Sequence, residues 1–227
     1  VHLSQTTRDR CVTHRGNVLL MAGTEPDENG LISLGPSPMG GDMLDSYDTA
    51  IVQTNPRMPF VFGEGTVIPA DRVAWMVEAE EDLPILPSAE PSEAEVKIAG
   101  HIVDRVPDGA CIQLGIGGVA SAIGRFLKDK RDLGIHTEMF VNALVELLKC
   151  GAANNSRKTI NPGKTVLGFS LGSQEMYDFM DRNPDIEARP FAYVNDPRII
   201  AQNDNMVSIN GAMQVDLMGQ VCAESIG

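Results

Sequence analysis

The chain has 227 residues, and its 18 Lys and Arg against 31 Asp and Glu give a formal net charge of −13 at pH 7. This acidic balance argues against a general nucleic-acid binder, which needs a basic surface to replace counterions. No apolar run approaches the ~20 residues that a membrane-spanning helix needs, and the first residues lack the layout of a signal peptide. We therefore expect a cytoplasmic globular protein that binds neither nucleic acid nor membrane.

Cysteine and histidine are few and dispersed. Cys11, Cys111, Cys150 and Cys222 form no C-x-x-C pair, and the four histidines are scattered. We expect reduced thiols and no metal site. Because the chain has no initiator Met and stops abruptly at Gly227, we also expect it to be an internal piece of a longer protein.

The first 86 residues show short apolar runs and turns with little helical pattern. Strands are expected over 17–22, 49–54 and 73–77, a polar turn over 25–30, and an irregular Pro- and Gly-rich loop over 56–65. Acidic residues and three prolines over 80–91 then indicate a stiff polar connector, which is the expected boundary.

From residue 92 onward, strand patterns alternate with helix patterns, which predicts an α/β sheet. Ser92 and Glu95 have the spacing of a capping box that opens a helix. We expect the following elements: strands over 110–114, 134–136, 164–169 and 188–193, helices over 119–127, 140–148 and 173–181, a helical turn at 195–198, and a hairpin joining 206–209 to 215–217.

A glycine loop joins the first of these strands to its helix. Gly115, Gly117 and Gly118 surround Ile116. Glycines let a backbone approach a ligand closely, and a helix N-terminus favours anions. The loop does not match the dinucleotide fingerprint. A tight strand-to-helix turn explains it as well as an anion site does.

Glu138 stands near the carboxyl end of the next strand, where open parallel sheets bind ligands. It is a candidate nucleophile or base, although the local pattern by itself favours an N-cap or a solvent-facing acid at the start of the following helix. His136 is two residues earlier and shares its face of the strand. Several asparagines, among them Asn195 and Asn210, are amide donors in a loop-rich region, and Glu224 is a further acid near the end of the chain.

Several motifs in order resemble the acetyl-CoA hydrolase/transferase family, most closely its 4-hydroxybutyrate and butyryl-CoA:acetate CoA-transferase branch. The similarity extends over nearly the whole chain. The segments that carry it are PDENG (26–30), QLGIGG (113–118), GIHTEM (134–139), RKT (157–159), YVNDP (193–197), IAQNDNM (200–206) and VDLMGQVCAESIG (215–227).

The resemblance implies a class I CoA-transferase fold, with two related open α/β domains and the active site between them. Residues 1–86 would then be the C-terminal part of the first domain, 87–91 the linker, and 92–227 most of the second domain. Relatives usually carry an acidic residue where this chain has Asn142, so the packing of the helix over 140–148 is a point of departure.

The resemblance also implies ping-pong chemistry through a glutamyl-CoA thioester. Glu138 would be the nucleophile, with Glu224 as the runner-up. Asn195 would donate to the oxyanion, with Asn210 as the alternative, and a second donor is expected in a Gly-Gly-x-x-Asp-Phe segment beyond Gly227. CoA would contact the loop formed by Gln113, Gly115, Ile116, Gly117 and Gly118.

The expected activity is transfer of CoA from 4-hydroxybutyryl-, butyryl- or acetyl-CoA to a carboxylate such as acetate. CoA is thus a substrate, no bound cofactor is expected, and the family implies a homo-oligomer. Three alternatives remain: an acyl-CoA hydrolase that uses the same glutamate, a non-catalytic CoA-binding module, and a sugar-phosphate isomerase, which would need a basic cluster that the site region hardly offers.

Overall fold

The computed structural model describes Gln5, residues 16–88 and residues 90–223. The first half contains a parallel sheet of strand order β1-β3-β5, an antiparallel pair of β2 and β4, and two short 3-10 helices. The strands and turn predicted for this half are confirmed. The elements are β1 (Gly16–Gly23), β2 (Leu31–Ser33), η1 (Gly41–Ser46), β3 (Tyr47–Thr54), β4 (Val67–Pro69), η2 (Ala70–Arg72) and β5 (Trp75–Glu78).

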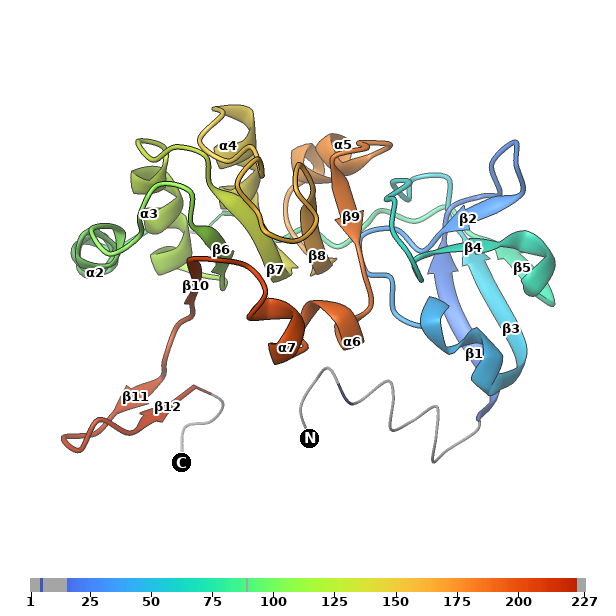
Figure 1. Cartoon of the computed structure of the whole chain (residues 1–227). Helices are drawn as coiled ribbons and strands as arrows, with labels where there is room; N and C mark the ends of the chain where they lie inside the picture. Colours follow the sequence, from blue (N-terminus) through green and yellow to red (C-terminus); the bar gives the residue numbers. More distant parts are fainter. Residues whose placement is uncertain (1–4, 6–15, 89, 224–227) are drawn as a thin grey trace.

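The second half is built on a five-stranded parallel sheet of strand order β10-β6-β7-β8-β9. Helices α2 to α5 lie on one side of this sheet, and α6 and α7 lie on the other (Figure 1). The predicted α/β class is therefore confirmed. The elements are α2 (Glu93–Val103), β6 (Cys111–Leu114), α3 (Gly118–Leu127), β7 (Gly134–Phe140), α4 (Asn142–Lys149), β8 (Thr165–Ser170), α5 (Gln174–Met180), β9 (Ile186–Ala188), α6 (Phe191–Val194), α7 (Pro197–Ile200), β10 (Met206–Ile209), β11 (Gln214–Val215) and β12 (Val221–Cys222).

The predicted capping box starts α2. The Ser92 hydroxyl accepts a hydrogen bond from the Glu95 backbone N–H, and the Glu95 carboxylate accepts one from the Ser92 backbone N–H at 2.7 Å. Two of the unpaired N–H groups at the start of the helix are thereby satisfied.

Two predicted elements are misplaced along the chain. The strand expected over 188–193 is wrong, because β9 ends at Ala188 and Phe191 already opens α6. Pro190 precedes this helix, where its fixed φ suits a helix start. The helix expected from Phe140 begins instead at Asn142, because Phe140 is still the last residue of β7.

The predicted hairpin between 206–209 and 215–217 is also wrong. Met206–Ile209 forms β10, which joins the edge of the central sheet parallel to β6. The hairpin in this region instead pairs β11 with β12. Its turn is organised by Asp216, whose carboxylate accepts hydrogen bonds from the backbone N–H groups of Met218 and Gln220, both at 2.8 Å.

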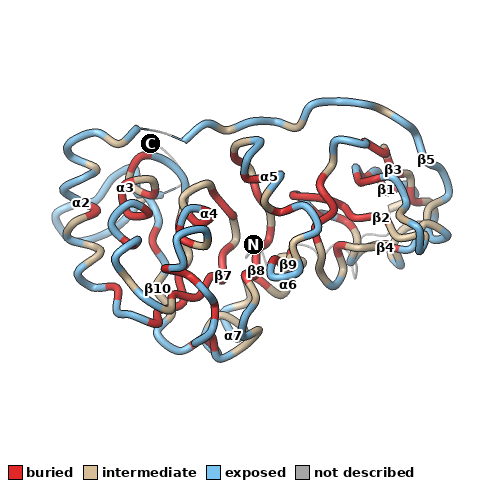
Figure 2. Tube along the Cα trace, turned by 90° about the horizontal axis from the view of Figure 1, so that it is seen from above, coloured by how far each residue is buried: buried red, intermediate tan, exposed pale blue. Residues whose placement is uncertain are grey.

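The two halves meet along β8 and β9. Phe62 pairs with Glu187 as an isolated parallel bridge, and the Ser170 N–H donates to the Pro36 carbonyl at 2.6 Å. Val61 is fully buried in the hydrophobic core of the larger sheet. Buried residues follow the central strands in Figure 2, while the connector from β5 to α2 runs exposed along one side. The loop over 56–65 therefore attaches one half to the other.

None of the helices within the described residues is both long enough and apolar enough to cross a membrane.

Candidate active site

Three neighbouring parallel strands end at the same edge of the central sheet. The register pairs Ile209 of β10 with Leu114 of β6, so that the glycine loop begins beside the end of β10. The ladder between β6 and β7 pairs Ile112 with Ile135. Counting three residues onward along each of these two strands reaches Gly115 and Glu138. The topology thus brings the loop and the predicted nucleophile to the edge where parallel sheets bind ligands.

Glu138 and Asn195 are in direct contact. The side-chain amide nitrogen of Asn195 donates a hydrogen bond to the carboxylate of Glu138, and both residues are only partly buried. The amide oxygen of Asn195 is buried and has no hydrogen-bond partner among the described residues. The predicted nucleophile therefore lies beside the amide that the resemblance assigned to the oxyanion.

His136 lies on the same face of β7 as Glu138 and is 1% exposed. Its Nε2 is 2.9 Å from the carbonyl oxygen of Val194, the residue before Asn195. Because a carbonyl only accepts hydrogen bonds, Nε2 must carry the hydrogen. Burial lowers the pKa of His136, the hydrogen bond to Val194 opposes this, and the charges of Lys158 and Arg189 lower it further. The ring is therefore neutral at pH 7.

The single turn of α6 positions Asn195, which is its C-terminal capping residue. At its other end, the Phe191 ring packs edge-to-face on Phe169 of β8, with a centroid distance of 5.9 Å. Gly168 makes room for this ring, since a Cβ there would lie 2.7 Å from Phe191 Cε1. A helix this short does not form on its own, so these contacts with β7 and β8 hold it.

The glycines of the loop play different parts. Gly115, Ile116 and Gly117 line a pocket of about 200 Å³ beside the start of α4. Gly117 has φ +99, and a Cβ on it would meet open space. Gly118 does not line this pocket and instead faces the Glu95 carboxylate, 2.4 Å from where its Cβ would be. A side chain at 118 would therefore push the Glu95 carboxylate out of its capping position at the start of α2.

Gln113 and Asn210 are paired with each other. The amide nitrogen of Gln113 donates to the oxygen of Asn210 at 2.9 Å, and that of Asn210 donates back at 3.0 Å. Ser208 adds a hydrogen bond to the Gln113 oxygen at 2.5 Å. This cluster connects β6 to β10 beside Gly115, and its bonds account for the polar groups of Asn210.

Asn142 also lies at this edge, and sequence reasoning did not assign it to the site. Its amide nitrogen donates to the Ser88 hydroxyl at 3.0 Å, and its oxygen accepts a hydrogen bond from the Ser173 N–H at 2.9 Å. Asn142 thereby fastens the connector to α4 and α5, and Leu86, Pro87 and Ser88 close one side of the pocket. The one sequence feature that could have drawn attention to Asn142 is its departure from the acidic residue that relatives usually carry there.

Of the remaining predicted residues, Glu224 lies outside the residues that the structure describes. Cys111 is 1% exposed, and burial raises the pKa of its thiol to about 11. Among the described residues, no three His, Cys, Asp or Glu side chains gather where they could hold a metal ion.

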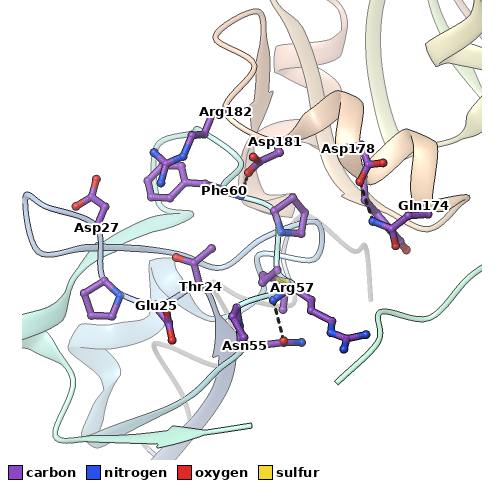
Figure 3. A pocket seen from close by; sticks show the side chains of 15 residues that line it. Thr24, Glu25, Asp27, Asn55, Arg57, Phe60, Gln174, Asp178, Asp181 and Arg182 are labelled. Atoms are coloured by element: carbon purple, nitrogen blue, oxygen red, sulfur yellow. Dashed lines mark hydrogen bonds between the residues drawn. The ribbon is translucent and has the colours of Figure 1, made fainter. Parts of the chain in front are cut away.

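A second, more polar pocket of about 470 Å³ lies between α5 and the loops after β1 and β3 (Figure 3). Two of the charged side chains that line it, Arg57 and Asp181, have partners within the protein. Arg57 pairs with Glu80 at 2.8 Å and also with Asp82, and the Asp181 carboxylate accepts a hydrogen bond from the Phe60 N–H at 2.7 Å. This pocket contains none of the predicted site residues, and it lies where the two halves of the molecule meet.

A comparison with known proteins finds one matching family model and several relatives that match nearly the whole of this chain. The model of the acetyl-CoA hydrolase/transferase C-terminal domain matches residues 172–227. The 4-hydroxybutyrate coenzyme A transferase of Clostridium kluyveri is 42% identical over 93% of this chain and 49% of its own length. A probable butyrate:acetyl-CoA coenzyme A-transferase of Syntrophomonas wolfei is 39% identical over 97% of this chain and 50% of its own.

A solved structure also matches the chain. The crystal structure of RipA from Yersinia pestis superposes with a TM-score of 0.95 at 38% identity, covering 99% of this chain and 52% of RipA. The chain thus spans about half the length of the relatives that it matches. The predicted class I CoA-transferase fold is confirmed.

Proposed function

The chain belongs to the acetyl-CoA hydrolase/transferase family, and from that premise we propose that the protein is a CoA-transferase. It moves CoA from a short-chain acyl-CoA, such as 4-hydroxybutyryl-, butyryl- or acetyl-CoA, to a carboxylate acceptor such as acetate. The observation that carries the proposal is the hydrogen bond from Asn195 to the Glu138 carboxylate at the ligand-binding edge of the sheet. CoA is a substrate here, and no resident cofactor takes part.

In the first half-reaction, a Glu138 carboxylate oxygen attacks the thioester carbonyl carbon. A C–O bond forms, the C–S bond breaks, and an acyl-glutamyl anhydride and CoA thiolate result. The thiolate then attacks the glutamyl carbonyl carbon and expels the donor carboxylate, which leaves a glutamyl-CoA thioester. Splitting one difficult transfer into two acyl substitutions is the advantage of a covalent intermediate.

In the second half-reaction, the acceptor carboxylate attacks the glutamyl carbonyl carbon and releases CoA thiolate. The thiolate attacks the acceptor's acyl carbon in the resulting anhydride, forming the new acyl-CoA and restoring the Glu138 carboxylate. Each attack passes through a tetrahedral oxyanion, and a preorganised donor contributes roughly 3–4 kcal/mol to its stability. Asn195 supplies such a donor from its amide nitrogen, which already lies against Glu138.

The pocket lined by Gly115, Ile116 and Gly117 is proposed to receive the part of CoA that approaches the thioester. Its largely apolar walls, which include Val141 and Leu171, suit an aliphatic chain, and the exposed backbone of Gly117 permits close approach. Gln113 would support this loop through its bonds to Asn210 and Ser208.

The test is to trap the intermediate on the intact protein. Incubation with butyryl-CoA followed by hydroxylamine should convert the glutamyl thioester into a hydroxamate at Glu138, detectable by peptide mass spectrometry. Glu138→Gln should give no adduct, and Glu138→Asp should give little because its carboxylate is set back. An undiminished adduct in Glu138→Gln would refute the assignment and direct attention to Glu224.

A second measurement separates transfer from hydrolysis, because water could resolve the same intermediate. A transferase releases free CoA slowly without acceptor and forms acetyl-CoA when acetate is added. Release of CoA at a rate independent of acetate would identify a hydrolase. Absence of both products with intact CoA binding would indicate a non-catalytic CoA-binding module.

The organisation of the whole protein is proposed from the same family. Residues 1–86 would belong to the first domain, 87–91 to the linker, and 92–227 to the second domain. The exposed apolar side chains of Leu20, Trp75 and Val77 support a larger first domain that covers them. A homo-oligomer in the cytoplasm is proposed as well, and the absence of a disulfide at Cys111 and Cys150 is compatible with that compartment.

A further inference from the structure

His136 is tied to the proposed active site by a short closed circuit of contacts. Its Nε2–H donates to the Val194 carbonyl at 2.9 Å. Val194 is bonded covalently to Asn195, and Asn195 donates to Glu138. Glu138 is in turn connected to His136 through the backbone of β7, in which the two residues are two positions apart. Each member of the circuit therefore restricts where the others can lie.

Several contacts fix the C-terminal end of α6: Val194 is 1% exposed, the Tyr193 hydroxyl donates to Asn161 at 2.8 Å, and the Arg189 guanidinium lies over the Tyr193 ring. Among them, the His136 bond holds the backbone carbonyl of the residue directly before Asn195. The helix has four residues, and the packing of Phe191 on Phe169 fixes its start. The hydrogen bond from His136 is the side-chain bond that the structure gives to the last residue of the helix. The Asn195 amide oxygen has no partner among the described residues, so the opposite side of that amide adds no restraint.

The imidazole is suited to this task and not to proton transfer. Within the described part of the chain, its Nδ1 is buried and has no hydrogen-bond partner. Burial and the neighbouring cations lower the pKa of His136, so the ring stays neutral and does not pair electrostatically with the nearby carboxylate. A neutral ring with its hydrogen on Nε2 donates to Val194 and leaves the charge of Glu138 uncompensated.

We propose that His136 is a positioning residue, which acts through the Val194 carbonyl to hold the Asn195 amide against the reacting carboxylate. The inference rests on the proposed function, since it concerns the rate at which Glu138 forms its thioester. A displacement of order 1 Å at a reacting group can lower a rate about 100-fold. Loss of the His136 hydrogen bond should therefore reduce the rate without altering the binding of acyl-CoA.

The experiment measures glutamyl-thioester formation by rapid quench into hydroxylamine, using the intact protein and butyryl-CoA. His136→Leu should lower the maximal rate by about 10- to 100-fold and change the half-saturating concentration by less than about twofold. His136→Gln, whose amide can donate to the same carbonyl, should recover most of the loss. A general destabilisation would not be rescued in this way.

A double-mutant cycle provides the sharper readout. If His136 acts through Asn195, then adding His136→Leu to Asn195→Ala should slow the reaction by less than about twofold, because coupled residues are not additive. Equal losses in both backgrounds, or no loss in the wild-type background, would overturn the inference. If the wild-type protein forms no adduct at all, the proposed function itself fails, and the inference falls with it.

Ser33→Ala is the matched control for folding. Ser33 lies in the first half of the molecule, whereas His136 lies in the second. Ser33 is buried, and its hydroxyl donates to the Val61 carbonyl at 2.8 Å. Its replacement should lower the thermal midpoint, as replacement of His136 is also expected to do, and leave the rate of thioester formation unchanged. A rate loss in Ser33→Ala equal to that in His136→Leu would show that reduced stability alone explains the effect.

Discussion

The amide nitrogen of Asn195 donates a hydrogen bond to the carboxylate of Glu138, although the two residues are 57 positions apart in the chain. Glu138 lies on strand β7 of the parallel sheet, and Asn195 caps the one-turn helix α6, which contacts that sheet. This arrangement brings the two side chains together. In the proposed mechanism, this contact orients the carboxylate before substrate arrives and places an amide donor next to the atom on which negative charge would develop. Preorganisation of this kind costs no rearrangement at the moment of reaction.

Asn195→Ala should lower the rate of glutamyl-thioester formation by about 10²–10³-fold, the usual effect of deleting one oxyanion donor. Rapid-quench kinetics on the intact protein measure it. Asn154→Ala is the matched control, because Asn154 is an exposed residue whose amide pairs with Asp132 at 2.8 Å, and it should react at the wild-type rate. A larger loss in Asn210→Ala than in Asn195→Ala would transfer the assignment to Asn210.

Gly118→Ala should destabilise the fold by disturbing the capping box of α2. The new methyl group would collide with the Glu95 carboxylate, 2.4 Å away, and the easiest response is for that flexible side chain to leave. The cost should be about 1 kcal/mol in the free energy of unfolding, the usual value of a lost cap. Urea denaturation measures it.

The matched test of this mechanism is Gly118→Ala in a Glu95→Ala background. With the carboxylate gone, the substitution should be neutral or stabilising by up to about 1 kcal/mol, because alanine is a better helix former than glycine. An equal loss of stability in both backgrounds would mean that another contact requires a glycine at 118.

Cys111 should resist alkylation in the folded protein. It is 1% exposed and burial raises the pKa of its thiol to about 11, so thiolate is scarce at pH 8. The exposed Cys150 should react with iodoacetamide within minutes under the same conditions. Peptide mass spectrometry reports both sites, and in urea they should react alike. Rapid labelling of Cys111 without denaturant would contradict its buried position.

The stability of the fold should rise with pH just above pH 8 because of Lys158. Its ammonium donates to the carbonyls of Ile135 at 2.9 Å and Lys164 at 2.6 Å, yet burial lowers its pKa from 10.5 to about 8. Between these values the unfolded chain binds a proton that the folded chain does not, so the free energy of unfolding increases with pH. The full effect is about 3 kcal/mol at 1.36 kcal/mol per pKa unit.

Cys111 has the opposite effect at higher pH. Its pKa is raised from 9.0 to about 11, so the folded protein keeps a proton that the unfolded chain loses, and stability falls across that interval. Urea unfolding at pH 8 and pH 9 should therefore show the wild type gaining about 1 kcal/mol relative to Lys158→Met. If the difference in the free energy of unfolding between wild type and Lys158→Met is the same at pH 8 and pH 9, and also in a Cys111→Ala background, the lowered pKa of Lys158 is refuted.

Local patterns predicted the elements whose causes are local. The capping box of Ser92 and Glu95, the glycine loop from Gly115, and the helix after it depend on neighbours within four residues, and the structure contains all three. The position of Glu138 near the carboxyl end of a parallel strand follows from the same reasoning. The resemblance of several motifs supplied the family, which no single local pattern could have identified.

Those local patterns could not predict strand pairs or hydrogen-bond partners that are distant in the chain. An apolar run such as Met206–Ile209 is compatible with a hairpin or with a sheet edge, and only the packing of the whole sheet placed it beside β6. Likewise, nothing near Asn142 in the sequence indicates Ser88, and nothing near His136 indicates Val194.

The sequence by itself determined which residues could carry the chemistry, because residue type and local pattern set the reactive groups and the ends of the strands. The tertiary structure alone decided which amide meets Glu138, because hydrogen bonds require contact in space and the chain must fold before residues in β7 and after α6 can touch. It also showed that Gly118 packs against Glu95 while Gly117 borders the pocket, a division that adjacent identical residues cannot reveal.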